Sequence, residues 1–174
     1  MQALPGRRTS DSSFRLLTTH ERGSAPWSKC GCCDPTDANV LRQMFCLFYA
    51  AGMGFNETEK SAWMIGGGCT LQWWPDTNEH HKQIWKGPLP AGACAIVHTH
   101  PRSTDPKPSN GDQNTAKQLG MCNYVLSLNG ISVAPPSGPP ISVATGTWWE
   151  PYKNTDCGGK KPKKPKKPKK PLPL

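Results

Sequence analysis

Two histidines and an aspartate are spaced so that they could share one metal ion. His98 and His100 are two residues apart at the end of an apolar stretch, so in a β-strand their side chains point to the same side. Asp112 follows twelve residues after His100, and Ser109 precedes it by one helical turn. Two imidazoles and one carboxylate around Zn²⁺ leave a fourth position for water, as in catalytic zinc sites. The spacing predicts a hydrolytic site that Ser109 also faces.

The loop between these ligands supports the same interpretation. It is rich in proline from Pro101 to Pro108, and such a loop loses little conformational entropy when it holds one shape. A His-x-His pair alone is a weak signal, and the alternative is two polar residues in a loop. Here the segment from His98 to Asp112 closely resembles the signature of the JAMM (JAB1/MPN/Mov34) metalloprotease family. That signature is His-x-His-Pro, seven residues and Ser-x-x-Asp, and it is matched at every fixed position.

A glutamate earlier in the chain extends this resemblance. The family carries a glutamate at the entrance of an earlier strand, followed by a small residue three places later and a glycine seven places later. Glu59 fits this spacing with Ala62 and Gly66, and Glu57 does not. The likeness covers about residues 34–150.

The resemblance implies a mechanism and a fold. His98, His100 and Asp112 would bind Zn²⁺, Glu59 would pass a proton from the attacking water to the leaving amine, and Ser109 would donate a hydrogen bond to the oxyanion. The reaction would be hydrolysis of a peptide or isopeptide bond in a protein or peptide substrate, ubiquitin-like conjugates included. The implied fold is an α/β JAMM/MPN-like layered domain with a mixed β-sheet flanked by helices, an architecture similar to that of cytidine deaminases.

A narrower resemblance concerns residues 109–132, which look most like compact bacterial JAB-type domains at the C-terminal ends of Rhs and other polymorphic toxin proteins. It implies a bacterial effector or toxin domain with an immunity or delivery protein as partner. The surrounding sequence is less similar to the RadC-like group. A catalytically silent MPN-like interaction module is the alternative function. A deaminase is disfavoured because the chain lacks the H-x-E and P-C-x-x-C motifs.

Local patterns predict the elements that must position these residues. Caps, apolar periodicity and glycine stops predict a buried helix from Val40 to Ala51 and a second helix from Ser109 or Asp112 to Leu119. Asn129-Gly130 is a hairpin turn signal. Strands are expected at residues 61–65, 69–74, 91–98, 122–128, 131–134 and 141–149.

Charge and composition divide the chain into three parts. The net charge of +9 comes mainly from eight lysines between Lys160 and Lys170, which leave 13 basic residues against 12 acidic ones. We therefore expect a disordered leader or linker over residues 1–33, a metallopeptidase domain over residues 34–152 and a disordered Lys/Pro-rich tail over residues 153–174. The tail is expected to contact anionic surfaces, and a nucleic-acid-binding function would rest on it alone.

No segment has the length and composition of a membrane span. The longest apolar run, residues 44–55, is shorter than the ~20 residues that cross a bilayer. The N-terminal residues do not resemble a signal peptide, which leaves the location open between the cytoplasm and delivery by a secretion system.

The eight cysteines lack the paired C-x-x-C spacing of structural zinc sites. Cys30, Cys32 and Cys33 form a cluster for which a disulfide, a metal site and an inert role stay open. Cys46, Cys94 and Cys122 lie in apolar runs and are interpreted as small buried hydrophobic residues.

Two tryptophan pairs, Trp73-Trp74 and Trp148-Trp149, are each expected to place one ring in the core and the other outside, because adjacent strand residues face opposite sides. An exposed row of such rings could bind a substrate chain, although core packing is the more frequent role.

Overall fold

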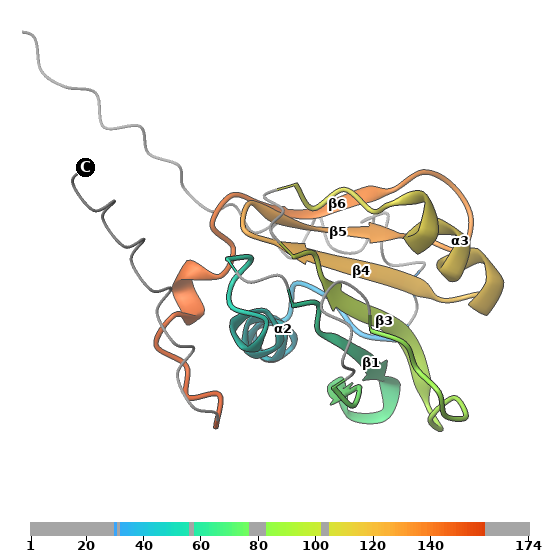
Figure 1. The fold of residues 1–174 in the computed structure, drawn as a ribbon, viewed down its shortest axis with the longest axis horizontal. Helices are drawn as coiled ribbons and strands as arrows, with labels where there is room; N and C mark the ends of the chain where they lie inside the picture. The colour runs from blue at the N-terminus through green and yellow to red at the C-terminus, as the bar shows by residue number, and fades with distance from the viewer. Residues whose placement is uncertain (1–29, 31, 56–57, 77–82, 102–104, 159–174) are drawn as a thin grey trace, which may run out of the picture.

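The computed structural model describes residue 30 and residues 32–55, 58–76, 83–101 and 105–158. They form a mixed six-stranded β-sheet with two α-helices, which confirms the expected α/β class (Figure 1). The predictions for the leader up to residue 29 and for the lysine-rich tail from residue 159 lie outside the described residues.

The elements follow the order expected from the sequence. They are α2 (Ala38–Ala50), β1 (Ser61–Ile65), β2 (Thr70–Trp73), β3 (Ala93–Thr99), α3 (Asn110–Leu119), β4 (Cys122–Ser127), β5 (Gly130–Ala134) and β6 (Ile141–Thr145), with 3₁₀ turns at Gly66–Gly68 and Glu150–Tyr152. The strand order in the sheet is β2-β1-β3-β4-β5-β6. Among these strands β3 and β4 are parallel and the other neighbours antiparallel, so α3 is the crossover between β3 and β4.

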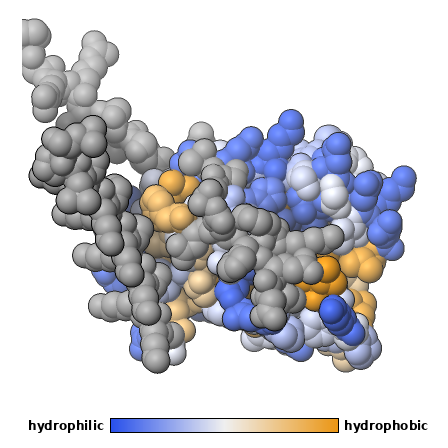
Figure 2. All heavy atoms as spheres, viewed as in Figure 1, coloured by the Kyte–Doolittle hydropathy of each residue, from blue (hydrophilic) through white to orange (hydrophobic). Residues whose placement is uncertain are grey.

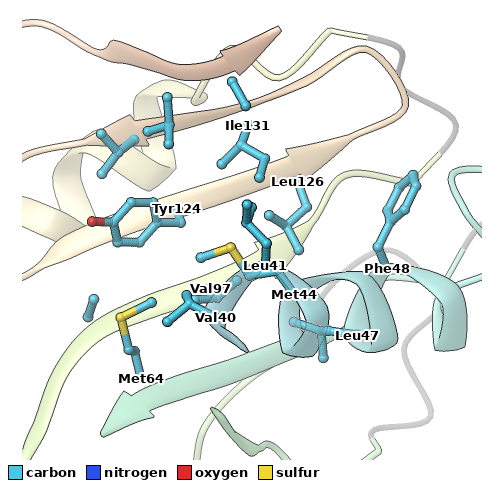
Figure 3. Packing of buried hydrophobic residues seen from close by; sticks show 14 of the residues in the cluster. Val40, Leu41, Met44, Leu47, Phe48, Met64, Val97, Tyr124, Leu126 and Ile131 are labelled. Carbon is cyan, nitrogen blue, oxygen red and sulfur yellow. The ribbon is translucent and has the colours of Figure 1, made fainter. Parts of the chain in front are cut away.

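Helix α2 begins at an aspartate cap and is buried along most of its length. The Asp37 carboxylate accepts hydrogen bonds from the backbone N–H groups of Asn39 at 2.8 Å and Val40 at 3.3 Å. Figure 3 shows the apolar side chains of α2 packed against side chains of the sheet, among them Val97 and Leu126. The helix contributes Val40, Leu41, Met44, Phe45, Leu47 and Phe48 to the buried core. Each such side chain stabilises the fold by about 1.5–3 kcal/mol on transfer from water.

Alternation along the strands gives the sheet two different faces. Ala95 and Val97 of β3 belong to the core under α2, while Ile96 and His98 point to the opposite side. Helix α3 covers that second face, because the Asn123 side chain donates a hydrogen bond to the α3 backbone. The second face carries the buried polar residues Ser61, His98, Asn123 and Ser132. The apolar cluster under α2 therefore lies on one side of the sheet, and these four buried polar residues lie on the other.

Hydrophilic residues make up much of the face drawn in Figure 2, outside the grey atoms. On the face drawn in Figure 2, coloured apolar residues gather in small groups between blue ones. The described part of the chain has no helix with the length and apolar character needed to span a bilayer.

The β4–β5 hairpin turns one residue earlier than predicted. Ser127 pairs with Gly130, which leaves Leu128 and Asn129 in the turn and makes Gly130 a strand residue. A Cβ atom on Gly130 would lie 2.6 Å from the carbonyl oxygen of Ala144. The glycine is needed because β6 approaches closely, and the turn itself does not require it.

The last strand is also shorter than predicted, since β6 ends at Thr145 instead of reaching residue 149. Trp148 then turns into the core, where its indole N–H donates a hydrogen bond to the carbonyl oxygen of Ser127 at 2.8 Å. This buried anchor ends the strand, because it requires the chain to leave the sheet edge.

All eight cysteines are paired in disulfides. The pairs are Cys30–Cys122, Cys32–Cys94, Cys33–Cys69 and Cys46–Cys157, with Cα atoms 5.3 to 6.0 Å apart. The interpretation of Cys46, Cys94 and Cys122 as unpaired hydrophobic residues is wrong, and the cluster of Cys30, Cys32 and Cys33 is a disulfide cluster. Apolar runs bury a disulfide as readily as a thiol, and pairing cannot be deduced from sequence.

These bonds connect distant parts of the chain. Three of them link the segment before α2 to β4, to β3 and to the residue before β2, and the fourth links α2 to Cys157. The cysteines that precede residue 34 and the one that follows residue 152 are thus bonded to cysteines within the expected domain, residues 34–152. Bonds of this kind form and persist in oxidising compartments.

Removing one crosslink tests this framework. The double variant Cys46→Ala, Cys157→Ala opens a loop closed across 111 residues. We expect its free energy of unfolding to fall by about 2–5 kcal/mol, because the unfolded chain regains conformational entropy. Urea unfolding without reductant measures the change. Thiol titration of the unfolded wild-type chain is the accompanying control, and reactive thiols there would contradict the pairing.

Candidate metal centre

His98 and His100 lie at the end of β3 on the face covered by α3. Backbone hydrogen bonds hold this end of the strand on both sides. The N–H of Thr99 donates to the carbonyl oxygen of Lys60 at 2.9 Å, and the N–H of His100 donates to that of Leu126 at 3.1 Å. Because Thr99 between the two histidines points the other way, both imidazoles face α3. Their ring centroids are 5.1 Å apart.

Asp112 reaches the histidines from the first turn of α3. Ser109 caps this helix: its hydroxyl accepts from the N–H of Asp112 at 3.2 Å, and the Asp112 carboxylate accepts from the N–H of Ser109 at 2.7 Å. This reciprocal pair is a capping box, and it fixes the position of the carboxylate relative to the helix.

The three predicted ligands converge. Nε2 of His98 lies 3.1 Å from one carboxylate oxygen of Asp112, and Nε2 of His100 lies 3.3 Å from the other. One ligand atom from each residue falls within 4.8 Å of the others, which makes a candidate metal site. Ligand atoms about 2.0–2.1 Å from a tetrahedral zinc ion lie ~3.3 Å from one another. Two imidazole nitrogens and a carboxylate at these separations fit such an ion.

The contacts within the cluster shift the pKa values of Asp112 and His98 in opposite directions. Burial alone would raise the pKa of the Asp112 carboxyl, but hydrogen bonds from His100 and His98 outweigh burial and hold that pKa well below its usual range. Burial would lower the pKa of the His98 imidazole, and its contacts with Asp112 raise that pKa instead. The carboxylate thus stays charged next to two rings. A divalent cation bound here would take the place of the proton that the carboxylate favours on the His98 ring.

Asn123 on β4 contacts two of the candidate ligands, and it was not among the residues selected from the sequence. Nδ1 of His98 donates to the side-chain oxygen of Asn123 at 3.0 Å, and the Asn123 amide donates to the backbone oxygen of Asp112 at 3.3 Å. A proton on Nδ1 leaves the lone pair of Nε2 available to a metal. A polar residue at an inward position of an otherwise apolar strand was the available signal.

Glu59 lies on the same face as the histidines. Ser61 pairs with His98, and Lys60 stands opposite Thr99, so the chain direction brings Glu59 level with His100. The Ser61 hydroxyl donates to the Glu59 carboxylate at 3.5 Å. Burial raises the pKa of Glu59, and the neighbouring His98 opposes this rise. The competing candidate Glu57 lies outside the described residues.

Ser109 caps α3, which is one of the two starts expected for this helix, and its hydroxyl also contacts the Asp112 carboxylate. Its hydroxyl donates to Asp112 at 2.7 Å and also caps α3, so both hydrogen-bonding functions of the oxygen are used within the helix terminus. A hydrogen bond from Ser109 to a substrate would require this hydroxyl to rotate away from Asp112.

These residues open into one cleft with a volume of about 320 Å³. Its floor is the polar face of the sheet, and α3 forms one side. The cleft is lined by Glu59, Ser61, Trp74, Gln83, Ile96, His98, Ser109, Gly111, Asp112, Thr115 and Asn123. Four of the five predicted site residues therefore line the same space, and the fifth, His100, adjoins it through its 3.3 Å contact with Asp112.

Comparisons of this chain with protein family models, curated proteins and solved structures give no match. A function has to be inferred from the residues of the cleft and from the resemblance in their spacing. Other histidines do not enter that inference, because His80 and His81 lie outside the described residues.

Replacing Asn123 tests its role as a positioning residue. Asn123→Leu keeps the approximate size and removes both hydrogen bonds, so His98 can turn and α3 loses a tether. We expect zinc affinity to fall by about 10–100-fold, the range for loss of such outer partners. Competition with a chromophoric chelator measures the affinity. Asn114→Leu, the same change at an exposed position of α3, is the matched control; equal losses in both variants would contradict the role.

Proposed function

We propose that this protein is a zinc-dependent hydrolase of a peptide or isopeptide bond, of the JAMM type. The observation that carries this proposal is the convergence of His98, His100 and Asp112 on the face that also holds Glu59. A structural zinc site has four protein ligands, whereas three ligands beside an open cleft suit catalysis.

His98, His100 and Asp112 are the residues that would hold the ion. Bound zinc supplies Lewis acidity, which lowers the pKa of a water molecule towards ~7 and polarises a carbonyl group. Asn123 keeps the His98 ring in the tautomer that ligation needs, and the capping box keeps Asp112 turned towards the histidines. The protein's own contribution is a site whose ligands are already oriented.

Glu59 is the residue suited to move the proton. It lies level with His100 across the β1–β3 pair and lines the cleft, so it can reach a water molecule that attacks a carbonyl there. Its raised pKa makes it a better proton acceptor than an exposed glutamate. After the attack, the same carboxyl can deliver the proton to the leaving amine.

Ser109 would donate its hydroxyl proton to the carbonyl oxygen of the scissile bond as negative charge develops there. The hydroxyl is 2.7 Å from Asp112, and cation binding would weaken that hydrogen bond by withdrawing charge from the carboxylate. Asp112 and the substrate would compete for the Ser109 hydroxyl, so the hydroxyl would rotate from the carboxylate to the substrate during the reaction.

The presence of a proton acceptor favours an enzyme over a silent interaction module. A scaffold needs neither the three ligands nor a buried carboxylate beside them, and burying such a group without use is unfavourable. The carboxylates of Glu59 and Asp112 line a face of the sheet that apolar side chains could otherwise have filled.

Metal analysis tests the ligand set. The full chain, loaded with zinc and freed of excess by gel filtration, is expected to retain about one ion per chain, and His98→Ala with His100→Ala is expected to retain none. Inductively coupled plasma mass spectrometry gives the zinc content. His80→Ala with His81→Ala is the matched histidine control, and unchanged zinc in the His98, His100 variant would place the metal elsewhere.

The role of Glu59 is tested separately from metal binding. Glu59→Gln keeps the size of the side chain but removes its basicity, so turnover of a peptide selected from a fluorogenic library should fall by ~100-fold or more. Zinc content should stay unchanged. Glu57→Gln and the exposed Glu150→Gln are controls with near wild-type turnover. Full activity in Glu59→Gln would remove the proton acceptor from the proposal.

A further inference from the structure

Three tryptophans cluster beside the metal centre and are not used by the proposed chemistry. The ring centroids of Trp63 and Trp74 are 5.1 Å apart, and each lies 5.8 Å from that of Trp85. Trp63 is buried, while Trp74 and Trp85 are half-buried. The cluster therefore extends from the buried sheet to the protein surface beside the cleft.

Strand pairing places Trp74 on the histidine side of the sheet. The N–H of Trp74 donates to the carbonyl oxygen of Ser61 at 2.9 Å, and Ser61 pairs with His98. Trp74, Ser61 and His98 therefore lie at the same level of three adjacent strands. Trp73 pairs with Ala62 and faces the opposite side, where it is 43% exposed.

The lining of the cleft is uneven in chemistry. The lining includes the carboxylates of Glu59 and Asp112, and it also includes two apolar side chains, Trp74 after β2 and Ile96 on β3. The described residues that line the cleft include no lysine or arginine. A ligand group with negative charge would meet like charge without a balancing cation from the protein, whereas an uncharged apolar group would gain burial against the indole.

Packing alone does not account for the tryptophan cluster. The indole N–H groups of Trp63 and Trp74 are buried, and neither has a hydrogen-bond acceptor within the described ranges. Buried donors without partners are rare and unfavourable in cores optimised for stability. These two unpaired indole N–H groups lie beside the candidate metal centre, which indicates that the aromatic cluster forms a wall that serves ligand binding.

The wall is held in place before any ligand arrives. The side-chain oxygen of Gln83 accepts a hydrogen bond from the N–H of Ser61, and its amide donates to the carbonyl oxygen of Pro75 at 3.2 Å. Gln83 is 8% exposed. Its two hydrogen bonds connect Pro75, the residue after Trp74, to the start of β1. A preorganised wall of this kind loses little entropy on binding.

We propose that Trp74 and Ile96 form a specificity subsite for an uncharged apolar side chain of the peptide residue next to the scissile bond. The inference rests on the proposed function, because the metal centre defines where that bond lies. The subsite favours leucine-like or phenylalanine-like side chains and rejects acidic ones.

Binding of small zinc ligands tests the subsite without turnover. The probes are the hydroxamates of N-acetyl-leucine, N-acetyl-phenylalanine and N-acetyl-aspartate, which share one metal-binding group and differ in side chain. Isothermal titration calorimetry on the zinc-loaded full chain should show the first two binding ~10-fold or more tightly than the third. Trp74→Ala should abolish this preference. Trp74→Phe and the neighbouring Trp73→Ala should keep it.

The outcomes separate the two proposals. Equal affinity of the three hydroxamates for the zinc-loaded wild type, or equal loss of preference in Trp73→Ala and Trp74→Ala, overturns the subsite and leaves the metal centre standing. Binding that persists after zinc is removed by a chelator places the probes away from the metal and overturns the subsite. Absence of binding by every hydroxamate overturns the open metal site, and the subsite with it.

Discussion

The carboxylate of Asp112 joins the two histidines at the end of β3, and the rest of the site depends on how firmly it is held there. It comes from the first turn of α3, where the capping box with Ser109 fixes its orientation. Asn123 on the neighbouring strand then ties the α3 backbone to the His98 ring. The crossover from β3 through α3 to β4 thus brings three elements to one point. A metal site needs such a hold, because ligands that can turn away bind weakly.

The division of the sheet into two faces has an energetic consequence. The face under α2 carries the apolar core, whereas the other face buries Ser61, His98, Asn123 and Ser132 and gains less from the hydrophobic effect. Disulfides compensate for this by restricting the unfolded chain. Three of them fasten the segment before α2 to the region of β2, β3 and β4, close to the strands that present the site. The polar face can then serve chemistry instead of stability.

Local signals predicted most of the elements, because a cap, a glycine stop or a period of two depends on neighbouring residues alone. Both predicted helices are present, with Asp37 as the cap of α2 and Ser109, one of the two expected starts, as the cap of α3, and each predicted strand has a counterpart in the sheet. The errors lie where distant residues decide. A glycine is needed at position 130 because the backbone of Ala144 approaches it closely. The strand β6 ends early because Trp148 is anchored in the core. The cysteines pair with partners 36 to 111 residues away, which no local pattern reports.

For the candidate site, the sequence by itself determined which residues were candidate ligands, since the choice of His98, His100 and Asp112 follows from residue type and spacing in one continuous segment. It also selected Glu59 through spacing that resembles a known family. Only the tertiary structure showed that these groups meet, because β1 and α3 reach the end of β3 through strand pairing and helix packing. Asn123 and Trp74 entered the site for the same reason. Strand pairing places Asn123 beside β3 and Trp74 beside β1, and a contact between separate strands leaves no mark in the order of residues along the chain.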